Sequence, residues 1–310
     1  MNLRLAILAL TDKYQLSAQH HAELKRLAGL EDAPPALSAH LQTGISLLGA
    51  ALGGLGVLFW IAANWQALSG LGRFALLEIV LAGSLLGAWR RPALRVPLSL
   101  LGFLACGGLF AHFGQTYQTG ADPWQLFALW AALTLPLCLS VRHAVLWTAW
   151  AVVALTAPLL WSGAADTRSV FHGSTGSWLP ALALAFALRH APGAGNWPVR
   201  LCIIYAAAGM VFFGVLSLFG EGGAIIYPLT LAALAASAYA YSRRALFDVF
   251  VISALGLGIN VLLVAGVARV LIEAEIIGML LIGCIAAALL AGTVKYIMHL
   301  TRLHHAGVGA

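Results

Sequence analysis

Long apolar blocks follow one another along most of this chain, and they constrain its fold more than any other feature. Each block is long enough to cross about 30 Å of hydrocarbon as a helix, at roughly 1.5 Å per residue. The chain is 61% hydrophobic and only 9% charged, whereas soluble domains carry about 25% charged residues. So little charge cannot cover a water-exposed surface. We therefore expect an all-α, polytopic transmembrane helical bundle.

The blocks predict about ten membrane spans. We expect them at approximately 44–64, 74–89, 96–113, 124–141, 144–161, 177–189, 200–219, 224–241, 246–268 and 275–293. Gly256 with Gly258, and Gly49 with Gly53, are small residues that allow helix backbones to approach closely in lipid. Such packing predicts a compact bundle and not a wide aqueous pore.

The placement of lysine and arginine in alternate loops predicts the orientation, because cytoplasmic loops carry an excess of positive charge. With the N-terminus inside, the cytoplasmic set is Arg4, Lys13, Lys25, Arg26, Arg90, Arg91, Arg95, Arg142, Arg189, Arg200, Arg243, Arg244, Lys295 and Arg302. Arg73, Arg168 and Arg269 remain outside. An odd span count would put the later basic clusters on the wrong side. We expect both termini in the cytoplasm.

Residues 1–40 are predicted to form a cytoplasmic helical hairpin. Two short runs each share one helical face, Leu3, Ile7 and Leu10, then Leu24, Leu27 and Leu30. Ser17 is placed to cap the second helix, and Pro34-Pro35 separates the hairpin from the membrane part. Residues 41–310 then form the transmembrane domain with a short cytoplasmic tail. The hairpin is either a solvated lead-in to the first span or a docking element for a partner.

A polar segment, Ala111–Phe127, interrupts the apolar pattern between the third and fourth spans. Asp122-Pro123 is typical of a helix start, with Asp122 as N-cap and proline at the first helical position. Gly120 permits the tight turn before it. A capped turn has no need of the other polar side chains here, so they are candidate binding residues. The candidates for binding a partner or a substrate are Glu78, His112, Gln115, Tyr117, Gln118, Asp122 and Trp124.

The stretch from Gly114 to Trp130, GQTYQTGADPWQLFALW, resembles the signature of a bacterial predicted membrane protein family, domain of unknown function 2157. The Leu16-Ser17 turn and Asn64-Trp65 at the end of the first span add to the resemblance. It implies a multi-pass protein of the bacterial inner (cytoplasmic) membrane. It also implies a complex with a related multi-span membrane protein and a small membrane-anchored periplasmic protein that carries a Gly-Asp-Tyr motif. The family supplies no functional residue to carry over.

Two acids and one amide fall within predicted spans, where polar groups are costly. Glu78 lies about one turn inside the second span, with Arg73 one turn before it. Asp248 follows Arg244 by four residues, so the two are expected to pair on one helical face. Asn260, near the middle of the ninth span, is expected to hydrogen-bond a neighbouring helix.

No sequence pattern points to a cofactor, a metal or catalysis. The motifs absent from the sequence include HExxH, a nucleophile elbow and a Walker loop. The four cysteines lie inside predicted spans without metal-ligand spacing, and we expect them to be small core residues. His299 and His304-His305 are expected in a headgroup-facing tail. The basic residues are dispersed beside the spans, so we expect no nucleic-acid partner.

Two functions remain open from the sequence. The first is a non-catalytic subunit of a multi-protein envelope complex, with the polar periplasmic segment receiving a partner. The second is a secondary transporter or flippase-like carrier with a site near the outer halves of spans two to four, where Glu78 would be the coupling acid. An intramembrane enzyme that uses His112 with Asp122 or Glu78 is a more distant alternative. We expect no enzyme, and the lipid bilayer is the one partner that composition requires.

Overall fold

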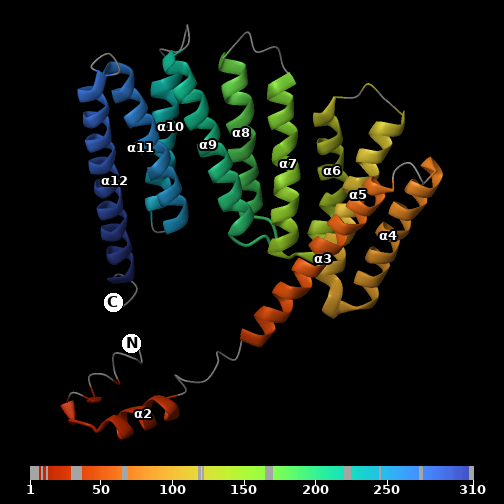
Figure 1. Ribbon diagram of the computed structural model, residues 1–310, viewed down its shortest axis with the longest axis horizontal. Coiled ribbons are helices and arrows are strands. Elements are labelled where there is room, and N and C mark those ends of the chain that lie inside the picture. The colour runs from red at the N-terminus through yellow and green to blue at the C-terminus, as the bar shows by residue number, and fades with distance from the viewer. Residues whose placement is uncertain are drawn as a thin grey trace. The chain divides into compact units, whose positions relative to one another are not determined.

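The computed structural model is all-helical over the residues that it describes (Figure 1). These are residues 7, 10–11, 13–28, 37–64, 69–117, 120, 122–164, 170–219, 225–243, 246–271 and 275–306. The chain forms two compact units, Met1–Leu52 and Gly53–Ala310. The expected class of helical membrane protein is confirmed, and the unit boundary falls inside a long helix.

The first unit contains the helix α2 (Ala18–Leu27) and the start of α3 (Leu37–Ala63). The Ser17 hydroxyl accepts a hydrogen bond from the backbone N–H of His20, at 3.4 Å, so the predicted N-cap is confirmed. Lys25 and Arg26 lie in the last turn of α2, where positive charge stabilises the carbonyl end of a helix. Pro34-Pro35 lies outside the described residues, as does Arg4.

The second unit continues from the end of α3 with nine more helices among its described residues. They are α4 (Gly70–Arg90), α5 (Arg95–Tyr117), α6 (Pro123–Val141), α7 (Ala144–Ala164), α8 (Val170–Arg189), α9 (Trp197–Phe219), α10 (Ile226–Ser242), α11 (Val249–Leu271) and α12 (Glu275–Ala306). A short 3₁₀ turn, η1 (Pro92–Leu94), separates α4 from α5. Together with α3, these helices lie at the ten predicted spans.

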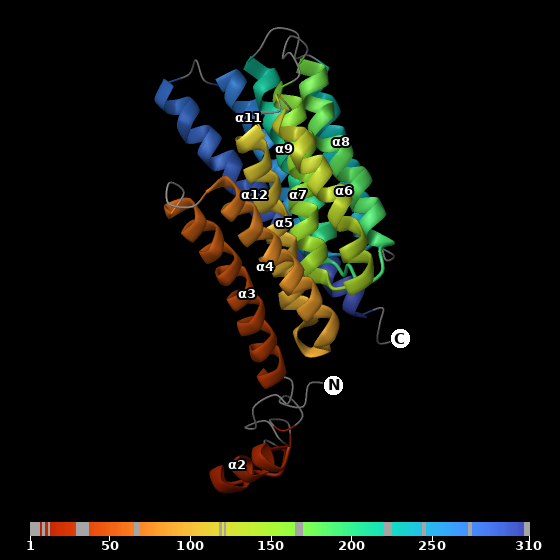
Figure 2. The ribbon, with the colours of Figure 1, turned by 90° about the vertical axis from the view of Figure 1, so that its right-hand side faces the viewer.

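Helices α4 to α12 stand in an elongated row (Figure 1). The odd-numbered helices α5, α7, α9 and α11 contact one another in sequence. Each of α6, α8 and α10 packs against both of its neighbours in the chain, α4 packs on α5, and α12 packs on α11. Figure 2 looks along this row from the α4 end, so the helices overlap one behind another. The sequence predicted a packed bundle, and the structure adds that the bundle is an open row.

Seven of the described helical segments are both long enough and apolar enough to cross a membrane. They are α4, η1 with α5, α6, α7, α9, α11 and α12. The helix α10 has 17 residues, and the apolar parts of α3 and α8 are shorter still. The count of ten spans therefore stays a prediction.

Glycine permits close contact between several neighbouring helices in the second unit. A Cβ atom on Gly107 of α5 would overlap the indole ring of Trp130 on α6. The Trp130 Nε1 donates to the carbonyl of Phe103, at 3.1 Å, which fixes the ring over this glycine. A Cβ on Gly256 of α11 would lie 2.9 Å from Thr293 of α12. Gly49 and Gly53, in contrast, meet no described atom within 4 Å.

Most arginines of the described helices gather at one end of the row. The connections between α4 and α5, α6 and α7, α8 and α9, and α10 and α11 all lie there, with the end of α12 (Figure 1). Polar contacts tie neighbouring elements together at this end: Arg95 to Ser140, Trp147 to Pro192, Arg200 to Asp248 and His304 to Ser242. That this basic end faces the cytoplasm stays a prediction, and Arg168 and Arg244 lie outside the described residues.

The helix α12 does not stop at residue 293, where its predicted span ends, but continues to Ala306. His304 on its last turn stacks on Phe247, with ring centroids 3.6 Å apart. His299 lies in the same helical extension. The tail that the sequence assigned to the headgroup region is therefore a helix, and His304 anchors it to the α10–α11 connection.

Replacement of Gly107 by alanine tests the α5–α6 contact. The added methyl group overlaps Trp130, so we expect the free energy of unfolding to fall by about 1–3 kcal/mol, as for overpacked cores. Thermal unfolding of the purified protein in detergent measures the change. Gly83→Ala in α4 is the control, because no described atom lies within 4 Å of its added methyl group. Equal midpoints for the two variants would contradict the assigned packing.

Candidate functional site

The helix α5 carries three of the candidate residues on its last two turns. We predicted that this span ends at residue 113, but α5 continues to Tyr117. His112, Gln115 and Tyr117 are therefore helical and not part of a loop. Because successive residues turn by about 100° around a helix, His112 and Gln115 are neighbours on the surface of α5, about 60° apart, whereas Tyr117 points in another direction.

The turn that follows has the predicted cap. Gly120 has a φ of +66°, a left-handed conformation that glycine adopts without strain. Asp122 is the N-cap of α6 and Pro123 its first residue, although the Asp122 side chain makes no capping hydrogen bond. Its carboxylate instead accepts a hydrogen bond from Trp124 Nε1, at 3.3 Å. Asp122 and Trp124 are thus brought together.

A cavity of about 520 Å³ lies between the end of α5 and the start of α6. Gln115 and Asp122 line it, together with Gln125. All three side chains are exposed, and no hydrogen bond to the side chain of Gln115 or Gln125 is found within the described residues. Gln125 was not among the candidates, although its place in the first turn of α6, three residues after the cap, is a position from which glutamine can reach back toward the turn.

His112 does not line this cavity and packs toward α4. It is 3% exposed, and its ring lies 4.3 Å from that of Phe74. Its Nε2 is 3.4 Å from the carbonyl oxygen of Gly70, and its Nδ1 is 3.3 Å from Thr116 Oγ1. We interpret His112 as a residue that fixes α5 against α4 and not as part of the cavity.

Tyr117 is exposed at the end of α5. Its ring lies 4.7 Å from Phe113, one turn earlier, and 6.1 Å from Phe74. The side chains of Tyr117 and Phe113 are 60% and 48% exposed. Phe113 also lines the cavity, so an aromatic surface borders the polar one.

Glu78 and Gln118 do not join this group in the described part of the structure. Glu78 is exposed on α4 and is absent from the lining of the α5–α6 cavity. Gln118 lies outside the described residues. The structure thus gathers Gln115, Asp122 and Trp124 near one turn, with Tyr117 beside it.

The predicted partner of Asp248, Arg244, is wrong, because Asp248 pairs with another arginine. Its carboxylate pairs with Arg200 of α9, with Nε to Oδ2 at 2.8 Å and Nη2 to Oδ1 at 3.1 Å. Asp248 also accepts from the backbone N–H of Phe250, at 3.0 Å, as the residue before α11 begins. The carboxylate therefore lies before the helix and not inside the span. Arg244 lies outside the described residues.

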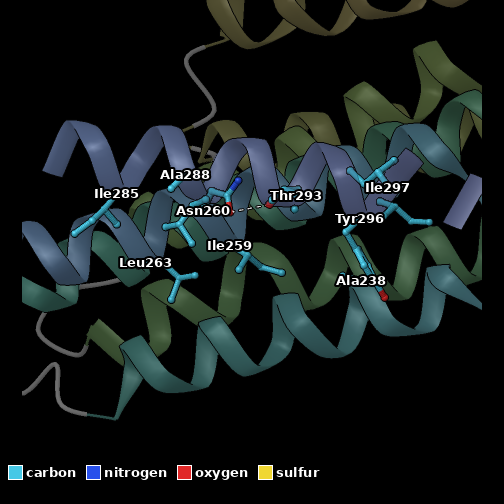
Figure 3. Close-up of a pocket in the computed structure, with 13 residues that line it drawn as sticks. Ala238, Ile259, Asn260, Leu263, Ile285, Ala288, Thr293, Tyr296 and Ile297 are labelled. Atoms are coloured by element: carbon cyan, nitrogen blue, oxygen red, sulfur yellow. Dashed lines mark hydrogen bonds between the residues drawn. The ribbon is translucent and has the colours of Figure 1, made fainter. Parts of the chain in front are cut away.

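Asn260 makes the predicted interhelical hydrogen bond. Thr293 Oγ1 of α12 donates to Asn260 Oδ1 of α11, at 3.1 Å (Figure 3). Both residues line an apolar cavity of about 570 Å³ between α10, α11 and α12. Asn260 Nδ2 is buried and has no partner among the described residues. Within the described residues, the one side-chain hydrogen bond between α11 and α12 thus lies in an apolar groove.

The cysteines do not all lie in the core. Cys138 and Cys202 are buried and Cys106 is half-buried, but Cys284 is exposed on α12. The helix α12 packs mainly on α11, so most of its surface has no protein neighbour among the described helices. The described residues contain no group of three or more His, Cys, Asp or Glu side chains that could hold a metal ion.

Comparison with known proteins gives one match. Residues 9–147 match the family model described as predicted membrane protein (DUF2157), so the predicted resemblance is confirmed for that segment. The segment includes α2 to α6 and the α5–α6 turn. No curated protein and no solved structure matches the chain.

Alanine replacements at His112 and Gln115 test whether the first side chain stabilises the packing of the helices and whether the second is an exposed side chain without such a role. We expect His112→Ala to lower the free energy of unfolding by roughly 2–5 kcal/mol, as for other large buried side chains. Gln115→Ala should change it by less than about 0.5 kcal/mol, because the side chain is exposed. Thermal unfolding in detergent compares the two. A stable His112→Ala protein would show that this imidazole does not hold α5 against α4.

Proposed function

We propose that this chain, whose residues 9–147 match the family model described as predicted membrane protein (DUF2157), is a non-catalytic subunit of a multi-protein envelope complex. Its α5–α6 turn receives a partner. The turn lies at the end of the row opposite the arginines, which is the periplasmic end in the predicted orientation (Figure 1).

The open cavity at this turn carries the proposal. Gln115 and Gln125 face it without hydrogen-bond partners in the described residues, and an amide that is covered by a partner must be paired. A glutamine side chain offers both a donor and an acceptor. It therefore suits the N–H and C=O groups of a peptide segment.

The aromatic border adds apolar contact area to this polar surface. The rings of Tyr117 and Phe113 contact each other in a tilted arrangement, and both side chains remain about half exposed. Tyrosine and tryptophan dominate binding energy in many interfaces, because they bury a large area with few rotatable bonds. Trp124, whose indole is held by Asp122, lies on the other side of the turn. We assign these side chains to partner contact.

The partner would be a periplasmic polypeptide segment. The resemblance described above implies a small membrane-anchored periplasmic protein and a related multi-span protein as neighbours. The former suits the α5–α6 turn, because it would approach from the periplasm. The latter would meet the chain within the bilayer.

The carrier alternative has less support from the geometry. Ion coupling requires an acid that faces the substrate path, and Glu78 is exposed on α4 and absent from the lining of the described cavities. The α5–α6 cavity itself lies at one end of the row and holds a single carboxylate, that of Asp122. A peptide-binding surface accounts for the exposed glutamines and aromatic rings more directly.

Co-purification in mild detergent tests the proposal. We expect the tagged full chain to retain a stoichiometric partner, and Tyr117→Ala or Trp124→Ala to reduce the retained partner at least about tenfold, as for interface residues that contribute over 1.4 kcal/mol. Trp161→Ala is the matched control, since Trp161 is an exposed tryptophan in the last turn of α7, at the same end of the row as the α5–α6 turn.

A photo-reactive residue at position 125, in place of Gln125, should crosslink to the same partner. The control position is Val270, which is 77% exposed at the same end of the row. A photo-reactive residue there should not crosslink, because Val270 belongs to α11 and not to the α5–α6 turn. Recovery of an unaccompanied monomer at every detergent strength would refute the proposal. Equal loss of partner in Trp161→Ala would show that the turn is not the contact.

A further inference from the structure

A polar cavity lies at the opposite, arginine-rich end of the row. It has a volume of about 390 Å³ and lies where α8 and α10 end and where α9 and α11 begin. Arg189, Asn196, Arg200, Tyr241 and Asp248 supply its polar side chains. The cavity belongs to a part of the chain beyond the residues of the family match, and it is separate from the α5–α6 turn.

Arg200 is held in place on several sides. Asp248 binds it through two hydrogen bonds, and the rings of Trp197 and Phe250 each lie 5.3 Å from its guanidinium carbon. The pair with Asp248 uses Nε and Nη2, whereas a guanidinium carries five N–H donors. Arg200 is therefore an oriented cation that has further donors for a ligand.

Arg189 contributes a second positive charge to the same cavity. It is the last residue of α8, and its guanidinium donates a hydrogen bond to the Tyr241 hydroxyl. Asp248 is the one carboxylate among the residues that line the cavity. The lining thus has two cations against one anion, and it favours a ligand with at least one negative charge.

The remaining lining narrows the class of ligand. Asn196 and Tyr241 add neutral hydrogen-bonding groups, and Asn196 precedes the first turn of α9, whose backbone N–H groups bear partial positive charge. Val199, Leu246 and Val251 supply apolar contact. Planar guanidinium groups match phosphate oxygens well. A phosphate ester, with a charged head and a carbon substituent, combines the two requirements.

We infer that the cavity between α8, α9, α10 and α11 binds a phosphate ester, through Arg189 and Arg200. At the end of the row predicted to face the cytoplasm, two sources supply this chemistry. One is the headgroup of an anionic phospholipid in the inner leaflet, and the other is a soluble phosphate ester.

Thermal unfolding of the delipidated full chain in an uncharged detergent tests the inference. The ligands are short-chain phosphatidylglycerol, short-chain phosphatidylcholine and glycerol 3-phosphate, compared at constant ionic strength. We expect at least one of the two anionic ligands to raise the unfolding midpoint by about 3 °C or more at saturation. A shift with phosphatidylglycerol alone identifies the lipid source, and a shift with glycerol 3-phosphate identifies the soluble one.

Arg189→Gln should weaken the apparent affinity at least about tenfold, because it removes a charge-assisted contact. Arg302→Gln is the control, because Arg302 is an exposed arginine in the last turns of α12, at the same end of the row as the cavity. This variant should bind the anionic ligand with the affinity of the wild type. Arg189→Lys keeps the positive charge but not the planar guanidinium, so it should retain part of the shift and stay informative even if Arg189→Gln unfolds. No shift with either anionic ligand, an equal shift with phosphatidylcholine, or an unchanged affinity in Arg189→Gln would overturn the inference.

Discussion

The absence of water in the bilayer is the constraint on which the rest of this structure depends. Backbone groups without water must be satisfied within each segment, so helices follow from the apolar blocks alone. The same absence removes the hydrophobic driving force between helices. The helices associate instead through close contacts such as Gly107 against Trp130, and through isolated polar contacts such as Thr293 to Asn260. Few such contacts hold each neighbouring pair.

Polar chemistry is consequently concentrated at the two ends of the row, where water and headgroups can reach it. One end carries most of the arginines and the paired Asp248, and the other carries Gln115, Gln125 and Asp122. The two sites make different demands on a ligand. The arginine-rich cavity is charged and partly preordered by its own ion pair, whereas the glutamine-lined cavity is neutral except for one carboxylate that Trp124 already contacts. The peptide and the phosphate ester proposed above would therefore bind at opposite ends of the row.

The sequence predicted helix identity well, because span length and local caps are local properties. Ser17 and the Asp122-Pro123 start show this. It failed where the partner is distant in the chain. The sequence paired Asp248 with Arg244 because of their spacing of four residues. Its partner in the structure is Arg200, which belongs to another helix, and the local pattern of residues does not predict a contact between helices. Likewise, the polar segment showed that His112 and Gln115 were unusual, but only the rotation of α5 separates a side chain packed on Phe74 from one that faces the cavity.

The row arrangement also bears on how the protein is made. Nearly every interface joins helices that are one or two apart in the sequence, such as α5 with α7 and α9 with α11. During synthesis from the N-terminus, each of these interfaces can form soon after its second helix leaves the ribosome, because the two helices are close together in the sequence. In a truncated chain that ends after α9, the helices α4 to α7 would still have all the helix neighbours that they have in the full chain. Among the described helices α4 to α12, assembly therefore needs no contact between the first helices and the last.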